Sequence, residues 1–569
     1  MGRRNTPREE PQRAAIPLRP ESMPAAGENG SESELPASAP RPPVWRRPIG
    51  WLIALAVMLR LVSAPYLISE ENPLFDPETF PNGDLIDNMQ QARQVLERGG
   101  TPEGYFKHGP LYVYLLAGVM KATGGRFWWM YGLQLCAGVA GVALMYLAAR
   151  RLIGEPGATA AGALAALYAP AVYYETVMTA DALNPVVVAL ILYLGARYQT
   201  HPQASAWRIP VLLGLALGGL TMLRANLCLI GLALAVWLPA APAAWAAGMS
   251  RGRVWRRRLG ALVLIAGVSL ITLIPVSIYN SRVAGRPRFV VGESNIIWQF
   301  SWSVDSPGYF YYPEGFPESE LLAPTDPRVL ALTARKLRQF FAWLEFPDLT
   351  NFHLYSRLSP PLHADPVTYR LVAPLGLVGL VLALFHPRRF SLLLGMFAVV
   401  LFAQILFYVS GRYRLTITPL LFLFAGLLAQ RAVELIRGRG LARRRLPALA
   451  GIAAGLLAAG ALVNVYDVSR LHSMWHSDSI FGNFALTRGA QAFAAGELEQ
   501  ARKFANRLMW LDYPEYQMQG HILLSEIARV EQKPYEMRRH LEEAERIRRA
   551  RAALPVLDAF GNKHFPPST

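Results

Sequence analysis

The sequence has few cysteines and few charged residues for its length. Only two of its 569 residues are cysteine, Cys136 and Cys228, and both lie in apolar stretches. Two isolated thiols exclude a scaffold held together by disulfides. Charged residues make up 17% of the chain and hydrophobic residues 53%, whereas a typical soluble protein has about 25% charged residues. This composition excludes an ordinary soluble enzyme and a wholly disordered protein, and it indicates a protein with many membrane spans.

Several common motifs of soluble enzymes are missing. The sequence contains no Walker phosphate-binding loop, dinucleotide-binding glycine motif, zinc-ligand cluster or nucleophile elbow. These absences give no support to a soluble nucleotide donor. We therefore predict that no cofactor is required and assign no metal ligands. A requirement for a divalent metal stays open.

Basic residues outnumber acidic ones, with 57 Lys and Arg against 40 Asp and Glu and a formal net charge of +17. An excess of this size often marks a nucleic-acid-binding protein. Here the basic residues stand between long apolar runs, which is typical of the cytoplasmic loops of membrane proteins. We therefore expect membrane lipid, and not nucleic acid, as a partner.

Eleven long apolar runs predict membrane-spanning helices. They lie at residues 49–68, 127–149, 157–174, 178–198, 208–223, 226–247, 259–278, 367–386, 390–409, 415–436 and 447–466. A shorter run, 111–123, is interrupted by Lys121 and falls short of the roughly 20 residues that a span needs. We predict that it is a juxtamembrane helix on the outer surface.

The basic segments select one orientation. If residues 46–47 are cytoplasmic and 111–123 does not cross, the arginine-rich segments 248–258 and 431–445 both face the cytoplasm. This agrees with the positive-inside tendency, and a crossing by 111–123 would turn the first of them outward.

These runs divide the chain into three regions. Residues 1–45 hold nine prolines, six arginines and six glutamates, which predicts a disordered cytoplasmic tail. Residues 46–466 form the membrane domain, with long outer loops at 70–126 and 279–366. Residues 467–569 are hydrophilic, helical in pattern and predicted to lie outside.

The C-terminal region has small residues at the spacing of a helix pair. They are Gly489, Ala492, Gly496, Ala501 and Ala505, followed by Pro514. One tetratricopeptide repeat has this pattern, and a plain helical hairpin explains it equally well. A repeat would offer residues 482–547 as a surface for a protein partner.

The first outer loop contains an amphipathic helix with an aspartate at its start. An apolar stripe runs through residues 85–96, Asp84 falls where the N-cap would stand, and Asp87 follows three residues later. The spacing favours a capping role. A carboxylate at a helix start beside the membrane is also well placed for general-base chemistry.

Other ionisable residues share the same predicted side. Lys107 and His108 precede a helix that begins near Pro110, where two cations would suit a phosphate or, equally, an interfacial position. Glu175 and Asp181 flank a tight turn between two spans. Such carboxylates either belong to a site with Asp84 or are ordinary loop residues.

Three arginines lie on the outer side, against the positive-inside tendency. Arg224 stands at a turn with almost no loop, and Arg412 and Arg414 begin the tenth span. Ionisable groups at membrane depth usually face a cavity or an anionic partner, and a bound phosphate would explain all three. Arg60, within the first span, could instead snorkel to the surface.

Taken in order, these motifs resemble the bacterial family 39 glycosyltransferases, relatives of protein O-mannosyltransferases and lipid A aminoarabinose transferases. The resemblance rests on the acidic start of the first-loop helix, K-x-G-P-L-Y, YLAARRLIG, YYE…TAD, GGLTMLRAN and GRYRL…P. It covers about residues 48–466. It implies an all-α polytopic membrane protein with the C-type glycosyltransferase fold, about 11 transmembrane helices and a small helical repeat domain, in the bacterial cytoplasmic (inner) membrane.

The resemblance also implies an activity. A sugar would pass from a polyprenyl (undecaprenyl) phosphate carrier to an extracytoplasmic acceptor, with inversion. The resemblance implies Asp84 as the catalytic base, Glu175 and Asp181 as supporting carboxylates, and Lys107 and Arg224 as lipid-phosphate ligands. Position and charge add Asp87 to the supporting carboxylates, and His108, Arg412 and Arg414 to the phosphate ligands. Leu85 stands where the family often has a second acid, and the segment after Asn280 departs from the family's Gly-rich pattern, so the acceptor stays open.

Other classes make different predictions. A lipid-linked-sugar transporter should carry paired charges along a path through both leaflets, whereas the candidate groups here lie on one side. A non-catalytic scaffold that presents the C-terminal domain should tolerate the loss of Asp84 and Arg224. Oligosaccharide ligases, which use similar carriers, are a closer rival.

Overall fold

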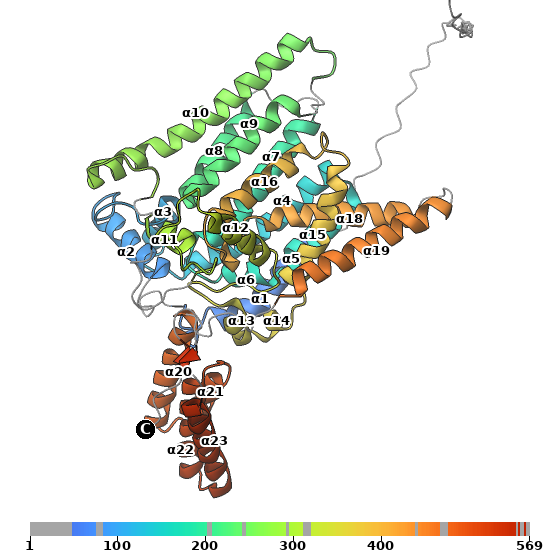
Figure 1. Cartoon of the computed structure of the whole chain (residues 1–569). Coiled ribbons are helices and arrows are strands. Elements are labelled where there is room, and N and C mark those ends of the chain that lie inside the picture. Colours follow the sequence, from blue (N-terminus) through green and yellow to red (C-terminus); the bar gives the residue numbers. More distant parts are fainter. Residues whose placement is uncertain are drawn as a thin grey trace, which may run out of the picture. The chain divides into compact units, whose positions relative to one another are not determined.

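The computed structural model describes residues 48–75, 83–201, 207–241, 246–291, 295–310, 320–437, 442–466 and 476–553, and the pairs 556–557 and 563–564. The predicted tail, 1–45, lies outside these residues. Within them, helices form nearly all of the regular structure (Figure 1). The strands found there are β1 (Val556–Leu557) and β2 (Lys563–His564), an antiparallel pair. The predicted all-α class is confirmed.

The first half of the membrane domain follows the predicted runs closely. Its helices are α1 (Pro48–Leu67), α2 (Asp84–Glu97), α3 (Pro110–Ala122), α4 (Trp129–Leu152), α5 (Glu155–Leu167), α6 (Ala169–Tyr174), η2 (Ala180–Ala182), α7 (Asn184–Thr200), α8 (Arg208–Leu223), η3 (Ala225–Leu229), α9 (Ile230–Ala240) and α10 (Arg251–Ala284).

The second half contains short helices from the segment 279–366 and then four apolar helices. They are α11 (Asn295–Trp302), α12 (Pro327–Phe340), α13 (Phe352–Tyr355), η5 (Ser356–Leu358), α14 (Pro360–His363), α15 (Tyr369–Leu384), α16 (Ser391–Ile405), α17 (Gly411–Arg414), α18 (Thr418–Arg437) and α19 (Ala442–Asn464).

Within the described part of the chain, six helices are long and apolar enough to cross a membrane, judged by length and composition. They are Pro48–Leu67, Trp129–Leu152, Ala180–Thr200, Arg251–Ala284, Thr418–Arg437 and Leu446–Asn464. Helices α3, α8, α15 and α16, and the segment Ala225–Ala240, are apolar but shorter. Six candidate spans indicate a multi-pass membrane protein, and the count of eleven stays a prediction.

One predicted span, 157–174, is divided into α5 and α6. The break falls at Tyr168, which has extended backbone, and Pro170 lies in the first turn of α6. Proline cannot donate a backbone hydrogen bond and disfavours a helical residue before it, which favours a break in the helix at this point. The amide of Ala169 instead donates to the carbonyl of Val367 at 3.0 Å.

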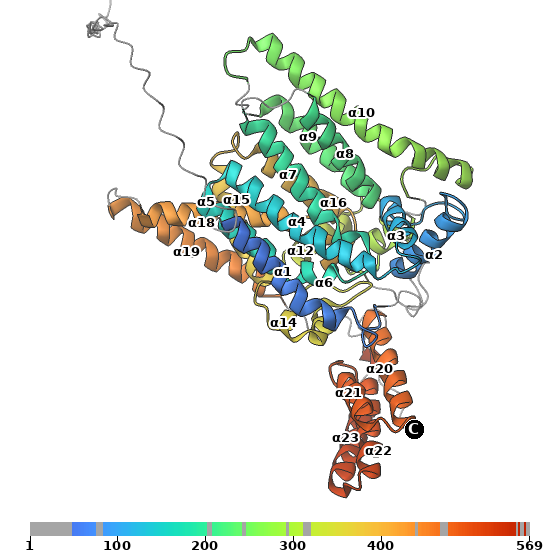
Figure 2. The same ribbon diagram turned by 180° about the vertical axis from the view of Figure 1, so that it is seen from behind.

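Buried apolar side chains of α1, α4, α5, α7, α8, α9, α15, α16 and α18 form one continuous core. Helices α4, α7, α8 and α9 run side by side in both views, and α2 and α3 lie together at one end of them (Figures 1 and 2). The run 111–123 is helical, as α3, which packs against α2, α4 and α8, and its position at the outer membrane surface stays a prediction.

The C-terminal region forms two successive helix pairs. They are α20 (His476–Ala494) with α21 (Leu498–Leu508), and α22 (Pro514–Val530) with α23 (Pro534–Ala553). Pro514 begins α22, where its missing N–H leaves no bond unmade. A tetratricopeptide repeat and a plain hairpin both predict helix pairs, so the repeat assignment and the partner surface at 482–547 stay predictions.

Candidate functional site

Five ionisable side chains from distant parts of the chain meet at the end of the bundle where α2 begins. We call them the Arg412 cluster: Asp84 from the start of α2, Asp181 from η2, Arg224 after α8, Asp348 between α12 and α13, and Arg412 from α17. Four of the five were predicted site residues, and Asp348 was not.

Arg412 is the centre of this cluster. Its Nη1 donates to Oδ2 of Asp84 at 2.5 Å and lies 3.5 Å from Oδ2 of Asp181. Its Nε donates to Oδ2 of Asp348 at 2.6 Å. The Arg412 side chain is only 7% exposed. Burying a guanidinium is costly unless anions and hydrogen bonds compensate it, and three carboxylates do so here.

Two hydrogen bonds hold α17 against the segment that carries Asp348. The Ser410 hydroxyl donates to Oδ2 of Asp348 at 2.7 Å, and the Gly411 amide donates to the carbonyl of Phe346 at 2.8 Å. Asp348 is almost fully buried. Its position fixes the orientation of the Arg412 guanidinium toward Asp84.

Asp84 is not the N-cap of α2, so the capping role that its spacing favoured is wrong. Gly83 occupies the cap position with φ +101°, and there is no side-chain capping bond. This backbone conformation suits glycine, and a Cβ there would lie 2.6 Å from Cδ2 of Leu349. Asp84 is consequently the first residue of the helix, and its carboxylate reaches Arg412.

The environment of Asp84 keeps it ionised. Burial opposes the charged form, but the charges of Arg412 and His108 outweigh burial and hold the pKa of Asp84 well below its usual value. The start of α2 also favours a negative charge. Asp84 is therefore a carboxylate throughout the neutral pH range.

Asp87, Lys107 and His108 form a more exposed group beside Asp84. Lys107 Nζ donates to Oδ1 of Asp87 at 2.8 Å, and His108 Nε2 lies 3.0 Å from Oδ2 of Asp87. His108 Nε2 also lies 3.6 Å from Oδ1 of Asp84. Burial lowers the pKa of His108, but the two aspartates more than offset it and raise the pKa above its usual value.

Gly109 brings this group close to Arg224. A Cβ at Gly109 would lie 2.7 Å from the carbonyl carbon of Leu223 and would overlap its oxygen. Only glycine permits this approach. The loop that carries Lys107 and His108 therefore packs directly on the residue before Arg224.

Arg224 is held by one anion and one ring. It donates to Oδ1 of Asp181, and its guanidinium carbon lies 3.4 Å from the centre of the Tyr413 ring. The Tyr413 hydroxyl is 2.5 Å from that of Tyr408. Arg224 keeps 18% of its side chain exposed, so part of its donor capacity is open to a further anion.

Glu175 has a different partner from Asp181. Its carboxylate accepts hydrogen bonds from Nε and Nη2 of Arg60 at 2.7 and 2.5 Å, and both side chains are buried. The suggestion that Arg60 snorkels is wrong, because its charge is neutralised inside the bundle. This two-bond geometry is typical of a structural ion pair.

Arg414 also has other partners. It is 1% exposed and donates to the carbonyls of Ala342 at 2.6 Å and of Leu344, and to Oε2 of Glu345 at 2.7 Å. Its guanidinium fastens the 340–345 segment to α17. At 1% exposure, Arg414 offers no accessible donor to the phosphate that it was expected to bind.

No sequence pattern marks Asp348 or Tyr413 as parts of this site. Asp348 stands in a long loop without periodicity, and Tyr413 reads as one more interfacial aromatic residue. The described ranges hold no group of three or more His, Cys, Asp or Glu side chains arranged to bind a metal ion.

Comparison with known proteins supports the motif-based resemblance. Residues 107–279 match the model of the family described as dolichyl-phosphate-mannose-protein mannosyltransferase. The resemblance is confirmed over this segment. It contains Lys107, His108, Asp181 and Arg224, whereas Asp84 and Arg412 lie outside it. No curated protein matches the chain in sequence.

Two solved structures are similar to the chain at low identity. ArnT from Cupriavidus metallidurans bound to undecaprenyl phosphate is 18% identical, with 89% of this chain and 79% of that chain covered and a TM-score of 0.42. The Archaeoglobus fulgidus oligosaccharyltransferase tethered to an acceptor peptide is 12% identical, with 79% of this chain covered and a TM-score of 0.40. The chain spans 58% of the length of that oligosaccharyltransferase.

Proposed function

We propose that the chain is a membrane glycosyltransferase that moves a sugar from a polyprenyl-phosphate carrier to an acceptor on the outer side of a bacterial inner membrane. The observation that carries this proposal is the meeting of Asp84, Arg412 and Arg224 in one cluster at one end of the bundle. The family match over residues 107–279 supports the same reaction class.

Asp84 is the proposed base. Its carboxylate accepts a hydrogen bond from the acceptor hydroxyl or amine, which attacks the anomeric carbon of the sugar from the face opposite the phosphate. The bond from the anomeric carbon to the phosphate oxygen breaks, and its electron pair leaves with the carrier phosphate. Because its pKa is low, Asp84 takes the proton only as the attack makes the acceptor group more acidic. The configuration at the anomeric carbon is inverted.

The predicted phosphate ligands fall into two groups that differ in the exposure of their side chains. Lys107, His108 and Arg224 have exposed donors, with 48%, 31% and 18% of their side chains accessible. Arg412 is enclosed by three aspartates, so we assign it to holding Asp84. Preorganised cations beside a leaving oxyanion stabilise the transition state, with about 3 kcal/mol for a well-placed donor. Asp87 and Asp181 orient these cations, and Glu175 stabilises the fold.

The purified protein in detergent tests this proposal. It is incubated with undecaprenyl-phosphate-linked mannose, glucose, galactose and aminoarabinose, and release of free undecaprenyl phosphate is followed by mass spectrometry. We expect release from at least one donor, faster when envelope glycan, lipid or peptide fractions are added as acceptors. No release from any donor with any acceptor fraction would contradict the proposed activity.

A further inference from the structure

The C-terminal helices bind the first outer loop through Glu71, which lies between α1 and α2. The Glu71 carboxylate accepts hydrogen bonds from Lys503 Nζ at 2.7 Å and from Arg507 Nη2 at 2.6 Å. Arg507 Nη1 also donates to the backbone carbonyl of Glu71 at 3.0 Å. The Arg507 side chain is 8% exposed and Glu71 34%, so one partner of this ion pair is buried, whereas both partners of an ordinary surface pair stand in water.

The pKa of Glu71 also reflects its ion pairs with Lys503 and Arg507. Partial burial raises its pKa, but hydrogen bonds and charge from Lys503 and Arg507 more than offset this and lower the pKa to about 2. Glu71 is therefore charged at every physiological pH.

A second contact joins the C-terminal helices to the long outer loop. Asn351 Nδ2 donates to Oδ1 of Asp478 in α20 at 2.9 Å, and both side chains are buried. Arg357 Nη1 donates to the carbonyl of Trp510 at 2.9 Å. Asn351 also caps α13 by accepting a hydrogen bond from the amide of His353. The loop end is thus fixed both by its own helix and by α20.

The two contacted segments are those that supply carboxylates to Arg412. Glu71 precedes Asp84 in the first outer loop, and Asn351 follows Asp348 by three residues. Asp84 and Asp348 meet at Arg412 inside the bundle end, while α20 and α21 join their segments on the other side. Both contacts of the C-terminal helices therefore fall on segments whose aspartates, Asp84 and Asp348, meet at Arg412.

We propose that Glu71 is a positioning residue, and that its contact with Arg507 holds the first outer loop so that Asp84 stays at Arg412. The C-terminal helices are then part of the catalytic assembly. This role rests on the proposed function, because it acts through Asp84.

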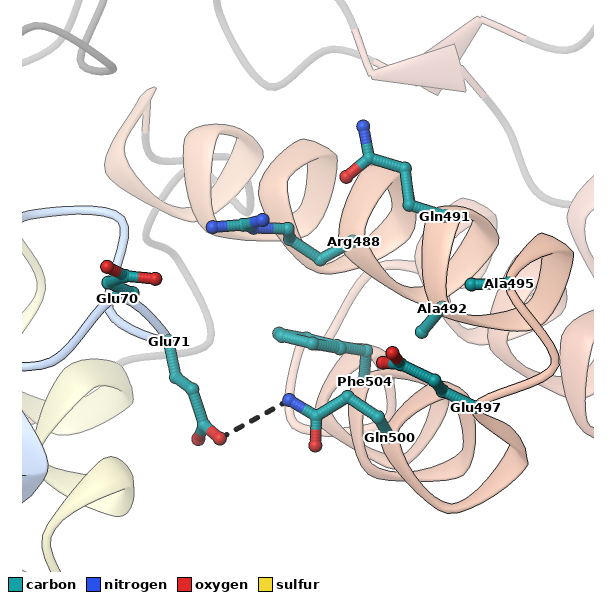
Figure 3. Close-up of a pocket in the computed structure, with 9 residues that line it drawn as sticks. All are labelled: Glu70, Glu71, Arg488, Gln491, Ala492, Ala495, Glu497, Gln500 and Phe504. Atoms are coloured by element: carbon teal, nitrogen blue, oxygen red, sulfur yellow. Dashed lines mark hydrogen bonds between the residues drawn. The ribbon is translucent and has the colours of Figure 1, made fainter.

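The chain supplies a matched control beside Glu71. Glu70 and Glu71 both line a cavity of about 300 Å³ between the loop and α20 and α21, together with Arg488 and Gln500 (Figure 3). Glu71 turns toward Gln500, which donates to it at 3.4 Å. Glu70 makes no ion pair within the described ranges. A Glu70→Gln change therefore removes the same charge from the same cavity without breaking the contact.

The first experiment needs no substrate. Full-length Glu71→Gln and Glu70→Gln variants in detergent are compared by hydrogen–deuterium exchange at α2. We expect faster exchange in the first turn of α2 for Glu71→Gln and unchanged exchange for Glu70→Gln. Exchange at α2 that is equal in both variants and the wild type would overturn the positioning role.

The second experiment measures transfer from the undecaprenyl-phosphate sugar that the wild type consumes. For Glu71→Gln we expect kcat to fall on the order of tenfold, as small displacements of a catalytic group do, with KM for the carrier unchanged. Exchanging the charges in a Glu71→Arg, Arg507→Glu double variant should restore most of kcat. If Glu71→Gln does not fold, the Glu71→Arg, Arg507→Glu double variant tests the proposal in its place. A double variant that recovers neither folding nor kcat would contradict the proposal.

Asp84→Asn is measured in parallel to separate this role from the proposed function. If Asp84→Asn is inactive while Glu71→Gln has wild-type kcat, the positioning role is wrong and the proposed function stands. If Asp84→Asn retains transfer, Asp84 is not the base, and the exchange at α2 still decides whether Glu71 positions the loop. The proposed function itself is contradicted if the wild type transfers from no donor.

Discussion

The carboxylate of Asp84 lies 2.5 Å from the guanidinium of Arg412, although 328 residues separate them in the chain. This ion pair joins the start of α2 to α17 and places a charged base candidate beside the most exposed arginine of the site, Arg224. Because Arg412 is also bound to Asp348, the geometry of Asp84 depends on both long outer loops. The functional proposal follows from this convergence.

Arg224 should contribute directly to binding of the carrier. We expect Arg224→Gln to weaken binding of undecaprenyl phosphate about tenfold to a hundredfold, because a hydrogen bond to a charged group contributes about 1.5–3 kcal/mol. Microscale thermophoresis in detergent measures the affinity. Arg126→Gln, which removes an exposed arginine from the first outer loop, is the control and should bind normally. Equal affinities for the two variants would remove Arg224 from the phosphate site.

Gly109 should be required for the packing of the Lys107 loop on Leu223. A Cβ at Gly109 would collide with the Leu223 backbone, and α8 cannot move freely to relieve the clash. We expect Gly109→Ala to destabilise the protein by about 1–3 kcal/mol and to weaken carrier binding, as measured by thermal unfolding and thermophoresis.

A glycine in α3 provides the matched control for this change. A Cβ at Gly118 meets nothing within 4 Å. Gly118→Ala should therefore stabilise the protein slightly, by about 0.5–1 kcal/mol, because alanine favours a helix interior over glycine. A Gly109→Ala variant as stable as Gly118→Ala would contradict the predicted close approach.

His108 should make stability depend on pH. Its pKa in the folded protein is raised above the value of 6.5 that applies to the unfolded chain. The protonated ring consequently stabilises the fold fully below pH 6.5, and this contribution is lost as the pH rises through the folded pKa. We expect the wild type to melt at a higher temperature than His108→Gln below pH 6.5, with the difference shrinking at alkaline pH. A difference that is constant from pH 5 to 9 would mean that the charge of His108 has no part in it.

The sequence predicted the helices well because long apolar runs leave the backbone few alternatives in a membrane. It also predicted that Asp84, Asp181, Arg224 and Arg412 share one side of the bundle. These predictions needed only the order of spans and the sign of charges. The division of 157–174 into α5 and α6 was missed, since the apolar pattern continues through Pro170.

Pairing between charged residues could not be read from the sequence. Arg412 and Arg414 look equivalent along the chain, but two residues apart on a helix they face different directions. Arg412 meets Asp84, while Arg414 binds carbonyls of the 340–345 segment. Likewise, Glu175 resembles Asp181 in its position along the chain, yet Glu175 forms an ion pair with the buried Arg60. The capping role of Asp84 failed because Gly83, with its positive φ, takes the cap position.

The central claim is that Asp84 is the base of a sugar transfer from a polyprenyl phosphate. The most direct test compares Asp84→Asn with Glu103→Gln, an exposed change in the same outer loop, in transfer from the donor that the wild type consumes and in binding of undecaprenyl phosphate. We predict that Asp84→Asn binds undecaprenyl phosphate and melts cooperatively but transfers at least about a hundredfold more slowly, while Glu103→Gln transfers normally. Transfer by Asp84→Asn at the rate of the wild type would contradict the account.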